Sequence, residues 1–195
     1  MGRNIKYVAV CLSFLMLAPF STDTFAKGPK KSHPGGPKNS QSGRKNFRAG
    51  AVYVLMNQTN NTVAVFRRNV KGMLTPAAEF PTGGAGNTTP QPPDPMTDPL
   101  ASQGALIISH GNRFLFAVNA GSNLISVLKI MKNELQLVDI VNSGGIRPIS
   151  LALNDDLLYV LNEGGTPNIT GFDVDEHGTL TPLATHSAVD WRRRS

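Results

Sequence analysis

The residue best suited to chemistry is Arg147, in the segment Gly144–Ser150, whose sequence is Gly-Gly-Ile-Arg-Pro-Ile-Ser. A guanidinium group offers parallel N–H donors, so an arginine presented by a short connection can bind a carboxylate or a phosphate through paired hydrogen bonds. The alternative is an arginine whose donors bond the carbonyls of neighbouring elements. Gln103, in the segment Ser102–Ala105, holds the corresponding place one unit earlier in the chain. We therefore take Arg147 and Gln103 as the candidate ligand-binding residues.

The sequence suggests neither a catalytic set nor a metal site. The histidines are scattered over turns, the basic N-terminal segment and the C-terminal end, where a solvated side chain is the simplest interpretation: His33, His110, His177 and His186. Gly83–Gly86 lacks the lysine and the following helix that a phosphate-binding loop requires. Asp94 and Asp98, between prolines, offer too few oxygen ligands for calcium. We assign no catalytic residue, metal or cofactor, and we interpret Glu163 as a turn residue that faces solvent.

Three similar segments provide the framework in which these residues must sit. Phe114–Asn119, Leu157–Asn162 and Ala51–Asn57 are each a run of β-branched and aromatic residues that ends in asparagine. Each is followed by a short turn and then by a second apolar run, which is typical of a β-hairpin. We interpret the repeated asparagine as structural, because asparagine tolerates left-handed backbone geometry and bonds its own backbone at strand ends.

The spacing of these segments indicates a repeated four-stranded unit. Asn119 and Asn162 are 43 residues apart, whereas Asn57 and Asn119 are 62 apart. The excess is explained by a Pro- and Gly-rich insertion, Gly83–Leu100, which we expect to protrude as a loop. A period of about 40–45 residues with four strands per unit is typical of the blades of a β-propeller. The sequence therefore predicts an all-β fold.

The strands of each unit follow from the same alignment. We expect Ala105–Ser109 and Ser150–Asn154 to be the inner strands of the second and third blades, and Gln136–Val141 to be the outer strand of the second. The first blade begins at its second strand, since only a polar, basic segment precedes Ala51. This gives eleven strands, whereas a closed propeller needs at least about four full blades. We therefore predict a partial β-propeller of about three four-stranded blades.

The ends of the chain differ from the repeats. Residues 1–26 are typical of a signal peptide, with a basic start, an apolar core and a small-x-small cleavage site. Residues 27–48 contain seven Lys or Arg, four Gly, three Pro and no acidic residue, so we expect a disordered basic linker. Residues 49–187 form the predicted propeller. The tail 188–195 matches no repeat and is interpreted as an aberrant end.

The formal net charge of +6 is located outside the predicted fold. Residues 49–187 contain seven Lys or Arg against eleven Asp or Glu, so the folded part is mildly acidic. That distribution argues against a nucleic-acid-binding surface on the propeller. The leader predicts a secreted or periplasmic protein with no transmembrane segment after cleavage. The linker is interpreted as a solvated spacer or, alternatively, as a tether to an anionic envelope lipid or polymer.

Several sequence patterns resemble one known family. They are Tyr159–Asn162, Phe116–Val127, Ser143–Pro148 and the repeated ending Gly-x-Leu-Thr-Pro. Together they resemble the lactonase-like seven-bladed propellers, of the bacterial 6-phosphogluconolactonase type and the fungal carboxymuconate lactonising type, which overlap with the Tyr-Val-Thr-Asn propeller repeats. The resemblance covers about Ala51–Leu183 and matches the N-terminal part of such a propeller. It implies the fold more specifically than the activity, because the shared residues build blades.

The resemblance implies two alternative functions. Enzymes of this family are expected to use His, Arg and Glu side chains at the mouth of the central channel, several of them in later blades. On that basis we expect an exported, truncated and non-catalytic fragment that binds a protein, a polymer or a small molecule at the propeller face. The alternative is a lactone hydrolase of the 6-phosphogluconolactonase type, in which Arg147 holds the oxyanion or a carboxylate. The open flanks of an incomplete blade array also predict aggregation or capture of a partner.

Overall fold

The computed structural model of the chain describes residues 8–11, 48–89, 99–100, 102–132 and 134–183. Several expectations therefore fall on residues outside the described ones. These are the signal-peptide cleavage site, almost the whole basic linker, the insertion between residues 90 and 98, the tail 188–195, His33 and His186.

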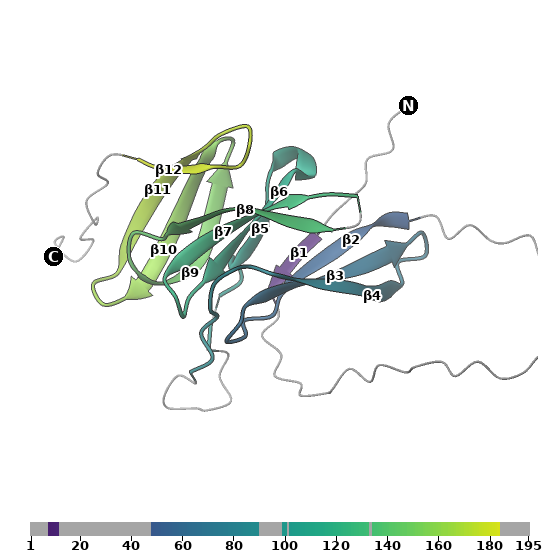
Figure 1. The fold of residues 1–195 in the computed structure, drawn as a ribbon, viewed down its shortest axis with the longest axis horizontal. Coiled ribbons are helices and arrows are strands. Elements are labelled where there is room, and N and C mark those ends of the chain that lie inside the picture. The colour runs from purple at the N-terminus through teal and green to yellow at the C-terminus, as the bar shows by residue number, and fades with distance from the viewer. Residues whose placement is uncertain (1–7, 12–47, 90–98, 101, 133, 184–195) are drawn as a thin grey trace, which may run out of the picture.

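The described residues form three four-stranded sheets that lie side by side (Figure 1). The first sheet contains β1 (Val8–Cys11), β2 (Arg48–Leu55), β3 (Thr62–Asn69) and β4 (Leu74–Pro81). The second contains β5 (Leu106–Ile108), β6 (Phe114–Asn119), β7 (Leu124–Ile130) and β8 (Leu135–Asn142), with a 3₁₀ turn, η1 (His110–Asn112), between β5 and β6. The third contains β9 (Ile146–Asn154), β10 (Leu157–Gly164), β11 (Asn168–Val174) and β12 (Leu180–Pro182).

Strand order within each sheet follows chain order, and β2–β3–β4, β5–β8 and β9–β12 are antiparallel meanders. We call the three sheets blades 1, 2 and 3. The predicted all-β fold, a partial propeller of three four-stranded blades, is confirmed. The predicted inner strands of blades 2 and 3 and the predicted outer strand of blade 2 are also confirmed, with ends that differ by one to four residues.

The first strand differs from the expectation. Val8–Cys11 belongs to the expected signal peptide, yet it pairs with Val52–Leu55, so blade 1 has four described strands and the described total is twelve rather than eleven. This pairing is parallel, whereas the inner strands β5 and β9 are antiparallel to β6 and β10. The reason is that an apolar, β-branched run has high strand propensity and the edge of β2 offers unpaired backbone groups.

The core lies between the blades. Every residue of β6 is buried, because blades 1 and 3 cover both faces of the middle sheet. Phe116 is fully buried, and burial of such a side chain contributes about 2–3 kcal/mol. In β10 the residues alternate between exposed and buried, since one face of blade 3 packs on blade 2 and the other does not meet a described sheet. The blade stack therefore fixes the strand ends at which candidate site residues lie.

The insertion is packed at its base. Asn87 N donates to Asn57 Oδ1 and Asn57 Nδ2 donates to Asn87 O, both at 2.8 Å. Asn87 Nδ2 also donates to Pro99 O at 2.9 Å, which closes the loop. A Cβ at Gly86 would lie 2.6 Å from the carbonyl carbon of Asn57, so only glycine fits there. The expectation that the insertion protrudes from Gly83 onward is therefore wrong for its first residues.

Candidate functional site

Arg147 lies near the start of β9 and faces Glu163 on β10. Ile146 pairs with Gly164 and Pro148 pairs with Asn162, which places Arg147 and Glu163 directly opposite each other. A guanidinium nitrogen of Arg147 lies 2.6 Å from Glu163 Oε2. The two side chains are 23% and 45% exposed, respectively, so the ion pair sits at the molecular surface but is partly shielded from water.

The backbone of Arg147 is held by the neighbouring blade. Its φ angle is 55°, which is unusual for a residue other than glycine. Its N–H donates to Asn123 Oδ1 at 2.7 Å, and Asn123 itself has a φ of 59° in the turn between β6 and β7. Such conformations persist where surrounding contacts fix them. Blade 2 therefore sets the position of an arginine whose side chain pairs within blade 3.

These contacts correct three expectations. Arg147 lies within a strand instead of the connection between blades, and its guanidinium forms an ion pair with Glu163 of the same blade, whereas the alternative interpretation had it bonding carbonyls of neighbouring blades. Glu163 is exposed, as predicted, but it is an ion-paired strand residue and not a turn residue. Gln103 lies in an exposed bend before β5, and no hydrogen bond or ion pair among the described residues joins it to Arg147. No contact among the described residues thus brings the predicted pair of ligand-binding residues together, and their ligand-binding roles stay predictions.

A buried polar cluster joins blades 1 and 2 at the strand ends. Asn119 Nδ2 donates to Ser126 Oγ at 2.7 Å, and Asn119 Oδ1 accepts from Thr82 Oγ1 at 2.6 Å and from Asn61 Nδ2 at 3.0 Å. Ser126 Oγ donates to the carbonyl of Thr82 at 2.7 Å. All four residues are at most 1% exposed. Since buried polar groups need partners, this cluster fixes how the two sheets meet.

The same arrangement joins blades 2 and 3. Asn162 Nδ2 donates to Thr170 Oγ1 and to the carbonyl of Ser143, both at 3.3 Å. Thr170 Oγ1 donates to that same carbonyl. A Cβ at Gly145 would lie 2.6 Å from Asn162 Cβ, just as one at Gly84 would lie 2.7 Å from Asn119 Cβ. We call each of these two clusters a blade joint.

The blade joints give the repeated asparagine a structural role, as predicted, but for a different reason. Asn119 and Asn162 do not have positive φ angles and they bond neighbouring strands and blades, although Asn57 does have a φ of 50°. The sequence carries a signal for the joints that the strand alignment did not use. Thr82-Gly-Gly and Ser143-Gly-Gly follow the outer strands of blades 1 and 2 at equivalent places.

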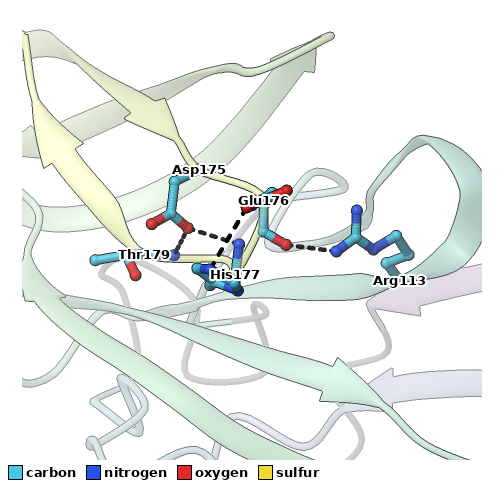
Figure 2. A network of polar contacts seen from close by, with 5 residues as sticks. All are labelled: Arg113, Asp175, Glu176, His177 and Thr179. Carbon is cyan, nitrogen blue, oxygen red and sulfur yellow. Dashed lines mark hydrogen bonds and ion pairs between the residues drawn. The ribbon is translucent and has the colours of Figure 1, made fainter.

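A further contact links blades 2 and 3 at the opposite ends of the strands (Figure 2). The Arg113 guanidinium donates to the carbonyl of Glu176 and lies 5.3 Å from the centre of the Phe114 ring. In the same turn, Asp175 Oδ1 accepts from the N–H groups of Thr179 and His177, each at 2.8 Å. These bonds, that of Thr179 first, lower the pKa of Asp175 below its ordinary value. The carboxylate acts as the cap of a tight turn.

Other chemical features of the described residues are few. A cleft of about 310 Å³ lies beside the second blade joint and is lined by the residues Asn142, Gly144, Thr170, Gly171, Phe172, Pro182 and Leu183. Arg147 does not line it, so the volume and the charged pair are separate features. Among the described residues, no group of three or more His, Cys, Asp or Glu side chains is placed to hold a metal ion. No described segment is a helix with the length and hydropathy of a membrane span.

Proteins that are related in sequence match part of the chain. A stretch of 82 residues is 37% identical to an uncharacterized protein of Staphylococcus aureus strain USA300, and the match covers 40% of this chain and 24% of that protein. An uncharacterized protein of strain N315 matches to the same extent. The chain thus matches about a quarter of the length of these curated relatives.

Solved structures resemble the three blades. A protein from Lactobacillus plantarum superimposes with a TM-score of 0.54 over 70% of this chain and 39% of its own, at 20% sequence identity. The periplasmic gluconolactonase of Pseudomonas aeruginosa gives 0.50 over 68% and 35%, also at 20% identity. These likenesses show the fold. The family model "Lactonase, 7-bladed beta-propeller" matches residues 43–191, and the chain therefore belongs to this family.

Proposed function

We propose that this chain supplies a ligand-binding surface of an exported lactonase-type propeller protein, with Arg147 as the residue that holds the ligand. The observation that carries the proposal is the ion pair between Arg147 and Glu163, at the surface end of the blade 2–3 contact. Glu163 uses one nitrogen of a group with five N–H donors. The guanidinium therefore retains donors for a second anion.

The chemistry of the pair favours a small anionic ligand. Arginine binds a carboxylate or phosphate by paired, charge-assisted hydrogen bonds. A neighbouring carboxylate favours hydroxyl donors on the same ligand, because Glu163 accepts hydrogen bonds but cannot donate them when ionised. A polyhydroxylated acid satisfies both groups. The name of the similar Pseudomonas aeruginosa protein, a periplasmic gluconolactonase, supports sugar acids as the first ligands to test.

Lactone hydrolysis is the second candidate function. It is favoured by the presence of a half-exposed carboxylate, Glu163, beside the cation. In this scheme the Glu163 carboxylate accepts a proton from water as the water oxygen bonds to the lactone carbonyl carbon, and Arg147 stabilises the oxyanion. The ring C–O bond then breaks, and the leaving oxygen takes up a proton to give the hydroxy acid. Arg147 alone is sufficient for the binding function.

Calorimetry on the purified full chain tests ligand binding. Gluconate and 6-phosphogluconate should bind, and Arg147→Gln should weaken binding about tenfold to a hundredfold, because a charge-assisted bond is lost. Arg67→Gln, which removes an exposed arginine of β3, is the matched control and should bind as the wild type does. Absence of binding by the wild type would refute the proposal.

The same protein tests hydrolysis. Glucono-lactone turnover that disappears in Glu163→Gln, with gluconate binding retained, would establish the second function. Turnover that is unchanged in Glu163→Gln would refute the role of this carboxylate. Turnover absent from the wild type, with binding present, would leave ligand binding as the function of the chain.

A further inference from the structure

Asn123 holds both ends of the connection between blades 2 and 3. Its carbonyl oxygen accepts a hydrogen bond from the Ser143 N–H at 2.9 Å, and its Oδ1 accepts one from the Arg147 N–H at 2.7 Å. Within the connection, Ser143 Oγ donates to the carbonyl of Gly145 at 3.1 Å. The turn between β6 and β7 therefore fixes the backbone that carries Arg147.

The connection between blades 1 and 2 has the same backbone contact but uses its side chains differently. Asn61 stands at the place of Asn123, because its carbonyl oxygen accepts from the Thr82 N–H, also at 2.9 Å. However, Asn61 Nδ2 and Thr82 Oγ1 both donate to Asn119 Oδ1 in the first blade joint. Asn123 and Ser143 bond the connection itself instead. Equivalent residues thus build a joint in one place and hold a strand start in the other.

This difference is unfavourable for stability in two ways. Asn162 Oδ1, the counterpart of Asn119 Oδ1, is buried and has no hydrogen-bond partner among the described residues. Arg147 has a φ of 55°, in the left-handed region that disfavours residues with a side chain. Pro148 favours an extended conformation at the residue before it, which adds to that strain. Strained backbone that is held by its surroundings clusters at active sites and ligand clamps.

We propose that Asn123 is a positioning residue of the ligand site, which holds Arg147 in the backbone conformation that directs its guanidinium to Glu163 and to the ligand. The direction of a side chain follows from the conformation of its backbone. Release of Arg147 into an extended conformation would therefore turn the guanidinium away from Glu163, which it now approaches to 2.6 Å. The inference rests on the proposed function, because it concerns the arginine to which the ligand is assigned there. It makes the site a joint product of blades 2 and 3.

Calorimetry with gluconate and 6-phosphogluconate on the purified full chain tests this role. Glycine allows the φ of 59° that Asn123 adopts, so Asn123→Gly removes the side-chain acceptor with little change in the turn. This variant should bind about threefold to tenfold more weakly than the wild type, which corresponds to one hydrogen bond.

Asn61→Ala is the matched control. It removes hydrogen bonds of the first blade joint only, so it should unfold at a lower urea concentration but bind both sugar acids as the wild type does. Circular dichroism checks that each variant is folded. Ser126→Ala, which removes one hydroxyl group of the same joint, replaces Asn61→Ala if that variant is unfolded.

A double-mutant cycle separates positioning from a general structural effect. Asn123→Gly should not weaken binding further in a chain that already carries Arg147→Gln, because the effect of Asn123 on the ligand passes through the guanidinium. Equal weakening in the two backgrounds would show that Asn123 acts on the ligand by another route, and the proposal would then be wrong.

Nuclear magnetic resonance adds a measurement that needs no ligand. The amide proton of Arg147 should exchange with solvent faster in Asn123→Gly than in the wild type, while amides of β6 and β10 keep their rates, since a single local bond is lost. Asn123→Asp keeps an oxygen acceptor and tolerates a positive φ, so it should restore slow exchange at Arg147.

The two measurements also distinguish failure of this inference from failure of the proposed function. Unchanged exchange at Arg147, or wild-type affinity in Asn123→Gly, would refute the positioning role and leave the proposed ligand site intact. Absence of binding by the wild type, with faster exchange at Arg147 in Asn123→Gly, would refute the proposed function and with it the role of Asn123 toward a ligand.

Discussion

Asn119 and Asn162 occupy the same place in successive blades but have different numbers of partners. Asn119 bonds three side chains, at 2.6, 2.7 and 3.0 Å. Asn162 makes two longer bonds through Nδ2, and its Oδ1 has no partner among the described residues although it is buried. An unsatisfied buried acceptor costs free energy. The side chain of Asn119 should therefore contribute more to stability than that of Asn162.

This difference predicts unequal effects of the same substitution. Asn119→Ala should reduce the free energy of unfolding by about 2–3 kcal/mol, and Asn162→Ala by about 1 kcal/mol or less, because the latter also removes an unsatisfied group. Urea unfolding at a concentration where the protein is monomeric measures both values. Asn60→Ala, at an exposed position, is the control and should have little effect. Equal losses in the two variants would contradict this account of the joints.

At the residue level, sequence reasoning found one half of the charged pair. Arg147 was predictable because it stands in a short Gly- and Pro-containing segment between repeats. Its pairing with Glu163 was not, since that contact depends on a register shift between Leu161 and Asn162 in the β9–β10 ladder. A one-residue shift changes which side chains face each other, and no residue type in either strand signals it.

At the scale of an element, the turn from Asp175 to Thr179 illustrates how a short segment links two blades. Asp175 accepts two backbone hydrogen bonds, and the next carbonyl receives the guanidinium of Arg113 from blade 2 (Figure 2). A Cβ at Gly178, whose φ is 91°, would lie 2.7 Å from the Phe114 ring. Capping by Asp175 thus holds a turn that must approach blade 2 closely.

This turn predicts a pH dependence of stability. The pKa of Asp175 is lowered in the folded chain from its ordinary value of 3.8. The ionised carboxylate therefore contributes stability at pH values above that ordinary value, and the contribution is lost as the pH falls through the lowered pKa. Asp175→Asn should destabilise the chain at about pH 6 and have a smaller effect at about pH 3. Urea unfolding at the two pH values measures this, and a penalty that grows toward low pH would contradict it.

Element types were predictable from the repeats, whereas their exact ends were not. The aromatic and β-branched runs around Phe116 and Tyr159 specified β6 and β10, because alternation and turn residues agreed in both. The inner strand β9 begins four residues earlier than expected, at Ile146. Glycines at 144 and 145 indicated a loop there. These two glycines are required because a Cβ on either would come too close to Thr170 or Asn162, and not because they form a loop. The strand can therefore start immediately after Gly145.

At the scale of the whole molecule, the repeat period was sufficient to predict three blades, because each blade buries its neighbour's apolar face and the same pattern therefore recurs. The inner position of blade 1 was not predictable in this way. β1 occupies it in a parallel orientation, and its residues belong to the expected leader. Cleavage after Ala26 would remove that strand, so export and this pairing cannot both hold for the mature chain.

This conflict can be resolved by comparing the full chain with a chain that begins at residue 27. β1 pairs with four residues of β2 and also lies against β5, whereas the hydrogen bonds of the two blade joints involve no residue before Asn61. We therefore expect amide hydrogen exchange in β6, β7 and β10 to stay unchanged in the shorter chain, with faster exchange confined to β2 and β5, the two strands that β1 contacts. N-terminal sequencing of protein recovered from the exported fraction should begin at Lys27. Faster exchange throughout the three blades would show that β1 is a required part of the fold and would argue against its removal during export.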